Sequence, residues 1–139
     1  MPADIFFDTT LLVYMATTRN DPRAAVAEEL LRAGGVVSVQ VLNEFVSVAR
    51  RKMRMSWESI EELLSAFTEL CGEPIPTTVE LHHAALQVAR RYGYHIYDSL
   101  MIAAANECGC TTLYSEDMQH GQRIGSLTIR NPFSSAATY

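Results

Sequence analysis

Short apolar runs alternate with longer amphipathic stretches along the whole chain. Three consecutive large apolar residues at 5–7 predict a buried strand, and β-branched or apolar runs predict further strands at 36–39, 111–115 and 127–129. Residues 74–76 form a candidate fifth strand that its two prolines would keep short. The predicted sheet therefore has four or five short strands.

Between these runs, apolar residues recur at three- and four-residue spacing, which predicts amphipathic helices. The helix after Asp21 has an acid at its cap and Pro22 in its first turn, and Gly34 and Gly35 end it. The segment 100–105 is almost entirely apolar and predicts a buried helix that opens near Asp98. Helices are predicted at about 11–16, 22–33, 38–52, 56–71, 78–92 and 98–108.

Alternation of helices and short strands indicates an α/β fold with a mostly parallel central sheet. No internal repeat and no linker rich in Pro, Gly or Ser divides the chain. We predict a single domain over residues 1–133. The last residues, 134–139, are predicted to form a flexible tail.

Composition supports a single globular domain of 139 residues, 48% of them hydrophobic and 19% charged. No apolar run approaches the roughly 18 residues that a membrane span needs. The N-terminus shows no cationic segment leading into an apolar one, so we expect no secretory signal, no membrane association and a cytoplasmic location. Cys71, Cys108 and Cys110 lack the spacing of a zinc or redox motif and predict thiols without a catalytic role.

The formal net charge of −5 argues against a protein that holds nucleic acid on a broad basic face. It leaves open an enzyme that acts on nucleic acid through carboxylate-bound cations and a local basic strip. Such a strip exists at Arg50, Arg51, Lys52 and Arg54. The cluster is either a solvated helix end that complements the helix dipole or an RNA-contacting strip.

Four acids occupy comparable places in the predicted elements. Asp8 and Asp117 follow strands, whereas Glu44 and Asp98 sit in the first turns of helices. Parallel strands with right-handed crossovers bring such positions to one edge of a sheet. Carboxylates gathered there would repel one another, and a hard cation such as Mg²⁺ would neutralise them.

Each acid taken singly is better explained as a helix cap or a solvated loop residue than as part of a site. Taken together, their apolar flanks favour a shared site, because an unpaired acid in apolar surroundings is costly. We therefore interpret Asp8 as a ligand and expect Thr9 or Thr10 to cap the helix that follows it. Thr10 and Ser115 are placed to hydrogen-bond the acids or a metal-bound water.

These residues resemble the motifs of PIN-domain ribonucleases, specifically the VapC-type toxins of bacterial toxin–antitoxin pairs. The resemblance rests on Phe-Phe-Asp-Thr-Thr at 6–10, Ser-Val-Gln-Val-Leu-Asn-Glu-Phe at 38–45, Tyr-Asp-Ser-Leu at 97–100, and Ser-Glu-Asp-Met-Gln-His-Gly at 115–121 running on to Asn-Pro-Phe at 131–133. It spans nearly the whole chain, with every acidic motif in order. Thr10, where the family often has Asn or Ser, and Ser99, where Ala is common, depart from the pattern.

The resemblance implies a three-layer α/β/α PIN-like fold and Mg²⁺- or Mn²⁺-dependent endonucleolytic cleavage of RNA. Asp8, Glu44, Asp98 and Asp117 would hold the metal, and a metal-activated water would attack the phosphodiester in line. The resemblance also implies a homodimer and a cognate antitoxin that lays a C-terminal segment along the toxin's groove.

Two other classes of function stay open on the residues alone. A haloacid-dehalogenase-like phosphohydrolase also begins with a strand ending in Asp, but its chemistry needs a second acid two residues on, where this chain has Thr10. A non-catalytic interaction module would use the acids only structurally. Loss of metal-dependent RNA cleavage on mutation of Asp8 or Asp98 separates the ribonuclease from both.

Overall fold

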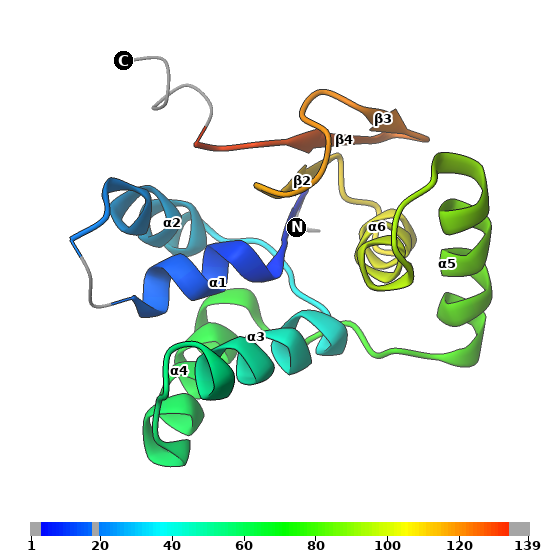
Figure 1. The fold of residues 1–139 in the computed structure, drawn as a ribbon. Helices are drawn as coiled ribbons and strands as arrows, with labels where there is room; N and C mark the ends of the chain where they lie inside the picture. The colour runs from blue at the N-terminus through cyan, green and yellow to red at the C-terminus, as the bar shows by residue number, and fades with distance from the viewer. Residues whose placement is uncertain (1–3, 18–19, 134–139) are drawn as a thin grey trace.

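The computed structural model describes residues 4–17 and 20–133, so the predicted tail at 134–139 lies outside the described residues. Within them the chain forms a four-stranded sheet and a set of helices, all connected by short loops (Figure 1). In chain order the elements are β1 (Ile5–Phe7), α1 (Thr9–Ala16), α2 (Pro22–Ala33), α3 (Val39–Arg51), α4 (Trp57–Cys71), α5 (Val79–Tyr92), α6 (Ile96–Glu107), β2 (Thr112–Tyr114), β3 (Arg123–Ile124) and β4 (Leu127–Arg130).

The strands lie in the order β1-β2-β4-β3. The first three run parallel, with Phe6 opposite Leu113 and Leu113 opposite Ile129, whereas β3 is antiparallel to β4. A mostly parallel sheet of four strands confirms the predicted class. The hairpin strand β3 was not predicted, because two residues contain too little apolar pattern to stand out from a loop.

The strands predicted at 36–39 and 74–76 are wrong in extent. The segment 36–39 keeps two isolated bridges, Val36 with Phe6 and Ser38 with Ile75, and the segment 74–76 keeps only the second of these. The backbone there is extended and paired, since Val36 N–H donates to Ile5 O at 2.8 Å. It cannot continue as a strand, because Ser38 caps α3 by accepting from Val41 N at 3.2 Å.

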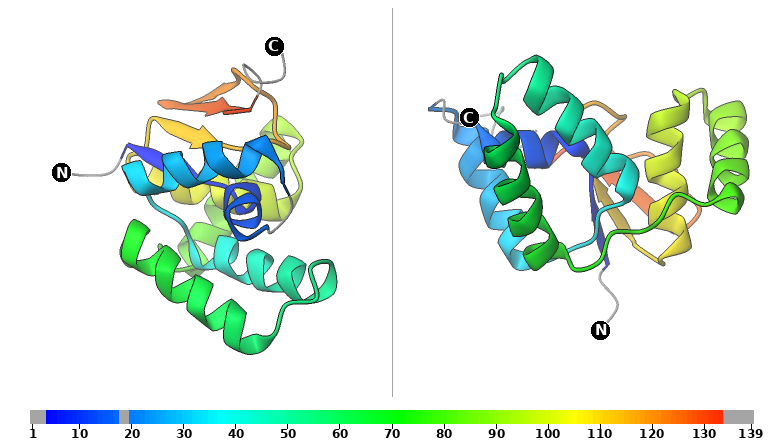
Figure 2. Two further views of the ribbon diagram at one scale, coloured as in Figure 1. Left: turned by 90° about the vertical axis from the view of Figure 1, so that its left-hand side faces the viewer. Right: turned by 90° about the horizontal axis from the view of Figure 1, so that it is seen from below.

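Helices cover the sheet on both sides and make a three-layer α/β/α arrangement. Figures 1 and 2 show α1 and α2 on one side of the sheet and α5 and α6 on the other, with α3 and α4 beyond the β1 edge. Because β1 and β2 are neighbours, their carboxyl ends open toward the starts of α1 and α6 and toward α3. This edge is where the acids of the sequence analysis meet.

The core fixes the elements that carry those acids. Phe6 and Phe7 in β1 are fully buried, and α6 is buried continuously from Leu100 to Ala105. A helix held by such an apolar face has one allowed position against the sheet, so its first turn is held at the sheet edge. Among the described residues no helix is long and apolar enough to cross a membrane.

Candidate active site

Asp8 stands at the junction of β1 and α1 and is only 3% exposed. Its Oδ1 accepts from the backbone N–H of Thr9 at 2.6 Å, and its Oδ2 accepts from the hydroxyl of Ser115 at 2.6 Å. Asp8 is itself the N-cap of α1, so the expectation that Thr9 or Thr10 caps this helix is wrong. The Asp8 side chain therefore both caps the helix and belongs to the site, because one carboxylate oxygen binds the helix end and the other binds Ser115.

The other three acids come from separate elements. Asp98 is in the first turn of α6, as predicted, and Asp117 follows β2 in the loop to β3. Glu44 is the sixth residue of α3 and therefore lies in its second turn, not the first. Ser38 is buried and caps α3, which sets the turn on which Glu44 faces α1.

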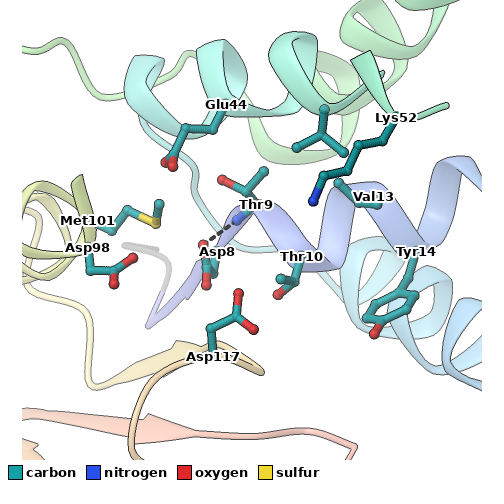
Figure 3. Close-up of a pocket in the computed structure, with 11 residues that line it drawn as sticks. Asp8, Thr9, Thr10, Val13, Tyr14, Glu44, Lys52, Asp98, Met101 and Asp117 are labelled. Atoms are coloured by element: carbon teal, nitrogen blue, oxygen red, sulfur yellow. Dashed lines mark hydrogen bonds between the residues drawn. The ribbon is translucent and has the colours of Figure 1, made fainter. Parts of the chain in front are cut away.

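All four acids line one pocket of about 340 Å³, the carboxylate pocket (Figure 3). The figure shows Glu44, Asp98 and Asp117 directed inward around Asp8. Thr9, Thr10, Val13, Tyr14, Val48, Lys52 and Met101 complete its lining. The structure thus brings together acids that are up to 109 positions apart in the chain, from Asp8 to Asp117.

Burial and nearby negative charge raise the pKa values of Asp8, Glu44 and Asp98. Burial, and to a lesser degree the charges of Asp98 and Asp117, raises the pKa of Asp8 to about 7, although its hydrogen bonds to Ser115 and Thr9 oppose the shift. Burial and then the charge of Asp98 raise the pKa of Glu44. Burial and then the charge of Asp117 raise the pKa of Asp98. The pocket therefore favours a proton or a cation over bare negative charge.

Several buried polar atoms of the pocket lack a protein partner. Thr10 Oγ1 is buried and makes no hydrogen bond within the described residues. Thr9 Oγ1 and Glu44 Oε2 are also buried and make no hydrogen bond of good geometry there, although Gln40 and Thr9 lie close enough to Glu44 to oppose the rise of its pKa. Ser115 has the predicted contact with Asp8, whereas the Thr10 hydroxyl contacts no acid through a hydrogen bond. Buried oxygens without partners are rare in folded proteins, and these can be satisfied by water or by a hard cation.

The same side chains do not form a closed metal cage. Within residues 4–17 and 20–133, no group of three or more His, Cys, Asp or Glu side chains is arranged to hold one metal ion. Mg²⁺ retains several waters and is usually bound directly by only one or two carboxylates. An open set of oxygens around a pocket with room for several waters fits that ion better than it fits Zn²⁺, which prefers nitrogen and sulfur in a closed tetrahedron.

Comparison with protein families identifies the family of the chain that carries this site. The family model described as the PIN domain matches residues 5–122, which include all four acids. The chain belongs to the PIN domain family. A search of curated proteins gave no match.

Two solved structures have the same fold as this PIN domain. VapC20 of Mycobacterium tuberculosis, a toxin that cleaves the sarcin–ricin loop, matches with a TM-score of 0.65 and 21% identity over 81% of this chain and 89% of its own. VapBC2 of Rickettsia felis, solved bound to a DNA fragment from its promoter, matches with a TM-score of 0.64 and 20% identity over 91% of this chain and 97% of the matched chain.

The four cations of the predicted RNA-contacting strip separate in this PIN domain. Arg50 donates to the carbonyl of Met55 at 2.9 Å, and its guanidinium lies 4.5 Å from the centre of the Trp57 ring. Lys52 lines the carboxylate pocket. Arg51 and Arg54 are exposed and do not line it. The cluster is therefore not one uniform surface.

Sequence reasoning missed two parts of the site. Tyr14 and Met101 line the pocket, one helical turn after Thr10 and Asp98 respectively, so helical spacing could have identified them. Glu116 accepts a hydrogen bond from the hydroxyl of Tyr14 at 2.5 Å and another from Arg23 Nη1 at 3.1 Å. No local signal marks these partners, since 102 positions separate Tyr14 from Glu116.

Proposed function

We propose that this PIN domain is a metal-dependent endoribonuclease and acts as the toxin of a toxin–antitoxin pair. The observation that carries the proposal is the carboxylate pocket itself. Four acids from four segments of the chain converge there beside buried oxygens that have no partner among the described residues. Such an arrangement destabilises the folded protein unless a cation or proton compensates, which favours a functional role over a structural one.

Asp8, Glu44, Asp98 and Asp117 would hold Mg²⁺ or Mn²⁺, with waters completing the coordination. When bound, the ion supplies a water of lowered pKa and neutralises charge that develops on the phosphate. Ser115 and the Thr9 amide hold Asp8 in one orientation, so its free lone pairs face the pocket. The hydroxyls of Thr9 and Thr10, which line the pocket, would orient the attacking water by hydrogen bonds.

We also propose the partners that the VapC resemblance implies. The substrate is RNA, the regulator is a cognate antitoxin protein, the toxin is a homodimer, and its location is cytoplasmic. Two observations support an antitoxin: a structural relative is a VapBC2 complex, and a pocket of four acids complements a basic side chain. Arg50, Arg51, Lys52 and Arg54 are the proposed contacts to the RNA backbone.

The decisive experiment is an RNA cleavage assay with purified, antitoxin-free protein. Total RNA is incubated with Mg²⁺, with Mn²⁺ or with EDTA, and cleavage is followed by primer extension. Discrete cuts are expected with either metal and none with EDTA. Asp98→Asn should reduce the rate by more than about a hundredfold, because even partners of metal ligands contribute about 10- to 100-fold.

Ser65→Ala is a matched control, since Ser65 is exposed on α4 and lines no part of the carboxylate pocket. It should cleave like the wild type. Absence of cleavage by folded wild-type protein with both metals would overturn the proposal. Full activity of Asp98→Asn would show that the carboxylates do not take part in the reaction and that RNA is cleaved at another site.

A further inference from the structure

A second, larger pocket of about 640 Å³ adjoins the carboxylate pocket. It lies between the C-terminal half of α1, the end of α3 and the first turns of α2 and α4. The two pockets share Val13, Tyr14, Val48 and Lys52 in their linings. The two pockets are therefore neighbours, and a chain-like ligand long enough to occupy both would run past these four side chains.

Lys52 occupies the boundary between the two pockets. Lys52 is the C-cap residue directly after α3. Figure 3 shows its side chain extending from the end of the helix toward the carboxylate pocket. Among the described residues it has no ion-pair partner, whereas Arg23 on the far side of the second pocket is paired with Asp21 and Glu116. Lys52 is thus the cation available to a ligand at this boundary.

We propose that the second pocket binds the nucleotide next to the scissile bond, with Lys52 contacting the phosphate between the two pockets. This inference rests on the proposed ribonuclease function and assigns one part of its substrate path. A phosphate entering a pocket of four acids is repelled unless a cation meets it on the way, and Lys52 is the cation at that place.

The lining of the second pocket suits a nucleotide. Val13, Val48, Met53 and Met55 supply apolar surface for the flat face of a base, and Ser59 adds a hydroxyl at its edge. Single-stranded RNA is generally bound by such apolar or aromatic surface together with contacts to the backbone phosphates. The second pocket therefore offers apolar surface for a base, with Lys52 at its boundary to contact a phosphate.

The first arm of the test measures binding without cleavage. A fluorescein-labelled single-stranded RNA of mixed sequence is titrated by fluorescence polarisation in EDTA at several salt concentrations. Lys52→Gln should weaken binding roughly fivefold to tenfold and lower the salt slope by about 0.7, the value for one lost phosphate contact on a single strand. Arg90→Gln removes a positive charge from an exposed position on α5 that lines neither pocket, and it should leave both values nearly unchanged.

The second arm fills the pocket. Ser59→Trp places a large ring in the second pocket, whereas Ser65→Trp makes the same substitution on an exposed position of the same helix. With Mg²⁺, the ratio of RNA cleavage to hydrolysis of bis(p-nitrophenyl) phosphate should fall about tenfold, or about 1.4 kcal/mol, in Ser59→Trp. The ratio should stay at the wild-type value in Ser65→Trp.

The outcomes separate this inference from the proposed function. Equal effects of Lys52→Gln and Arg90→Gln, or equal ratios in the two tryptophan variants, would overturn the second pocket as a nucleotide site. So would a Ser59→Trp protein that cleaves RNA normally but no longer binds the antitoxin, since the pocket would then belong to the protein partner. Failure of the wild type to cleave RNA would overturn the proposed function, while the binding arm would still test the pocket.

Discussion

Two adjacent acids, Glu116 and Asp117, differ in whether their carboxylates have partners. Both oxygens of Glu116 are paired, one with the hydroxyl of Tyr14 and the other with Arg23, whose guanidinium also lies 4.6 Å from the centre of the Tyr14 ring. Asp117 opens into the carboxylate pocket, where no acid forms a salt bridge within the described residues. Glu116 thus forms a closed network with Tyr14 and Arg23, whereas Asp117 belongs to a cluster of acids without a paired cation among the described residues.

The difference shows how an acid that serves the fold can be distinguished from one that serves a site. A paired carboxylate at a partly exposed position stabilises the folded state modestly. A buried carboxylate beside like charges destabilises it, as the pKa of about 7 for Asp8 indicates, and the exposed Asp117 adds its charge to that cluster. A bound cation or proton would offset this destabilisation, and the contrast can be tested at three levels.

The largest expected effect concerns the two adjacent acids themselves. Asp117→Asn should reduce metal-dependent RNA cleavage by more than about a hundredfold, as expected for loss of a group that holds the metal or its waters. Glu116→Gln keeps an acceptor for Tyr14 and should reduce cleavage far less. Both rates are measured with the same RNA at saturating Mg²⁺, together with urea unfolding of each variant.

Unfolding should give the opposite order. Glu116→Gln weakens the ion pair with Arg23 and should lower the free energy of unfolding by up to about 1 kcal/mol. Asp117→Asn relieves repulsion and should not lower it. If Glu116→Gln reduces cleavage as strongly as Asp117→Asn, the closed network contributes directly to catalysis and the distinction between the two acids fails.

The second prediction concerns the pH dependence of stability in metal-free protein. Burial raises the pKa of Asp8 from 3.8 to about 7 in the folded state, so the folded protein binds more protons than the unfolded chain between these values. Stability must therefore fall as pH rises from about 4 to about 7. We expect a loss of about 2 kcal/mol from this residue, because relaxation around the charge reduces the full linkage value.

The measurement is urea unfolding in EDTA at a series of pH values, for the wild type and for Asp8→Asn. The wild-type curve should decline more steeply with pH than that of the variant, and their difference isolates Asp8. Adding Mg²⁺ should restore stability more at pH 7 than at pH 5, since protons and the ion compete for the same oxygens. Parallel curves for the two proteins would show that Asp8 is not held in an unfavourable environment.

The sequence alone predicts the site better than it predicts the contacts around it. Apolar runs indicate where strands end and helices begin, so the sequence alone predicts that Asp8, Glu44, Asp98 and Asp117 meet at one edge of the sheet. The long apolar run of α6 fixes Asp98 especially well, because a helix buried on nearly all sides has little freedom. The role of these acids as metal ligands stays a prediction.

Contacts that depend on side-chain direction could not be predicted. The strip at 50–54 lies where α3 ends and the chain turns, and Arg54 has a positive φ of 53°, so helical periodicity no longer relates one cation to the next. Arg50 and Lys52 are two positions apart at the end of α3 and therefore point to different sides, Arg50 to Trp57 and Lys52 to the carboxylate pocket. Asp8 was considered as a helix cap, but the role was assigned to Thr9 or Thr10 because capping and metal binding were treated as exclusive roles for one side chain.

The smallest expected effect tests the closed network through a single hydroxyl. Tyr14→Phe removes the hydrogen bond to Glu116 but keeps the ring beside Arg23 and the edge contact with Phe133, whose ring centre is 5.0 Å away. The free energy of unfolding should fall by about 1 kcal/mol, the usual value for one hydrogen bond. Tyr97→Phe is the matched control, because Tyr97 is 50% exposed, and its unfolding should be unchanged. Equal stability of the two variants would mean that Arg23 alone holds Glu116, and the network would reduce to an ion pair at the surface.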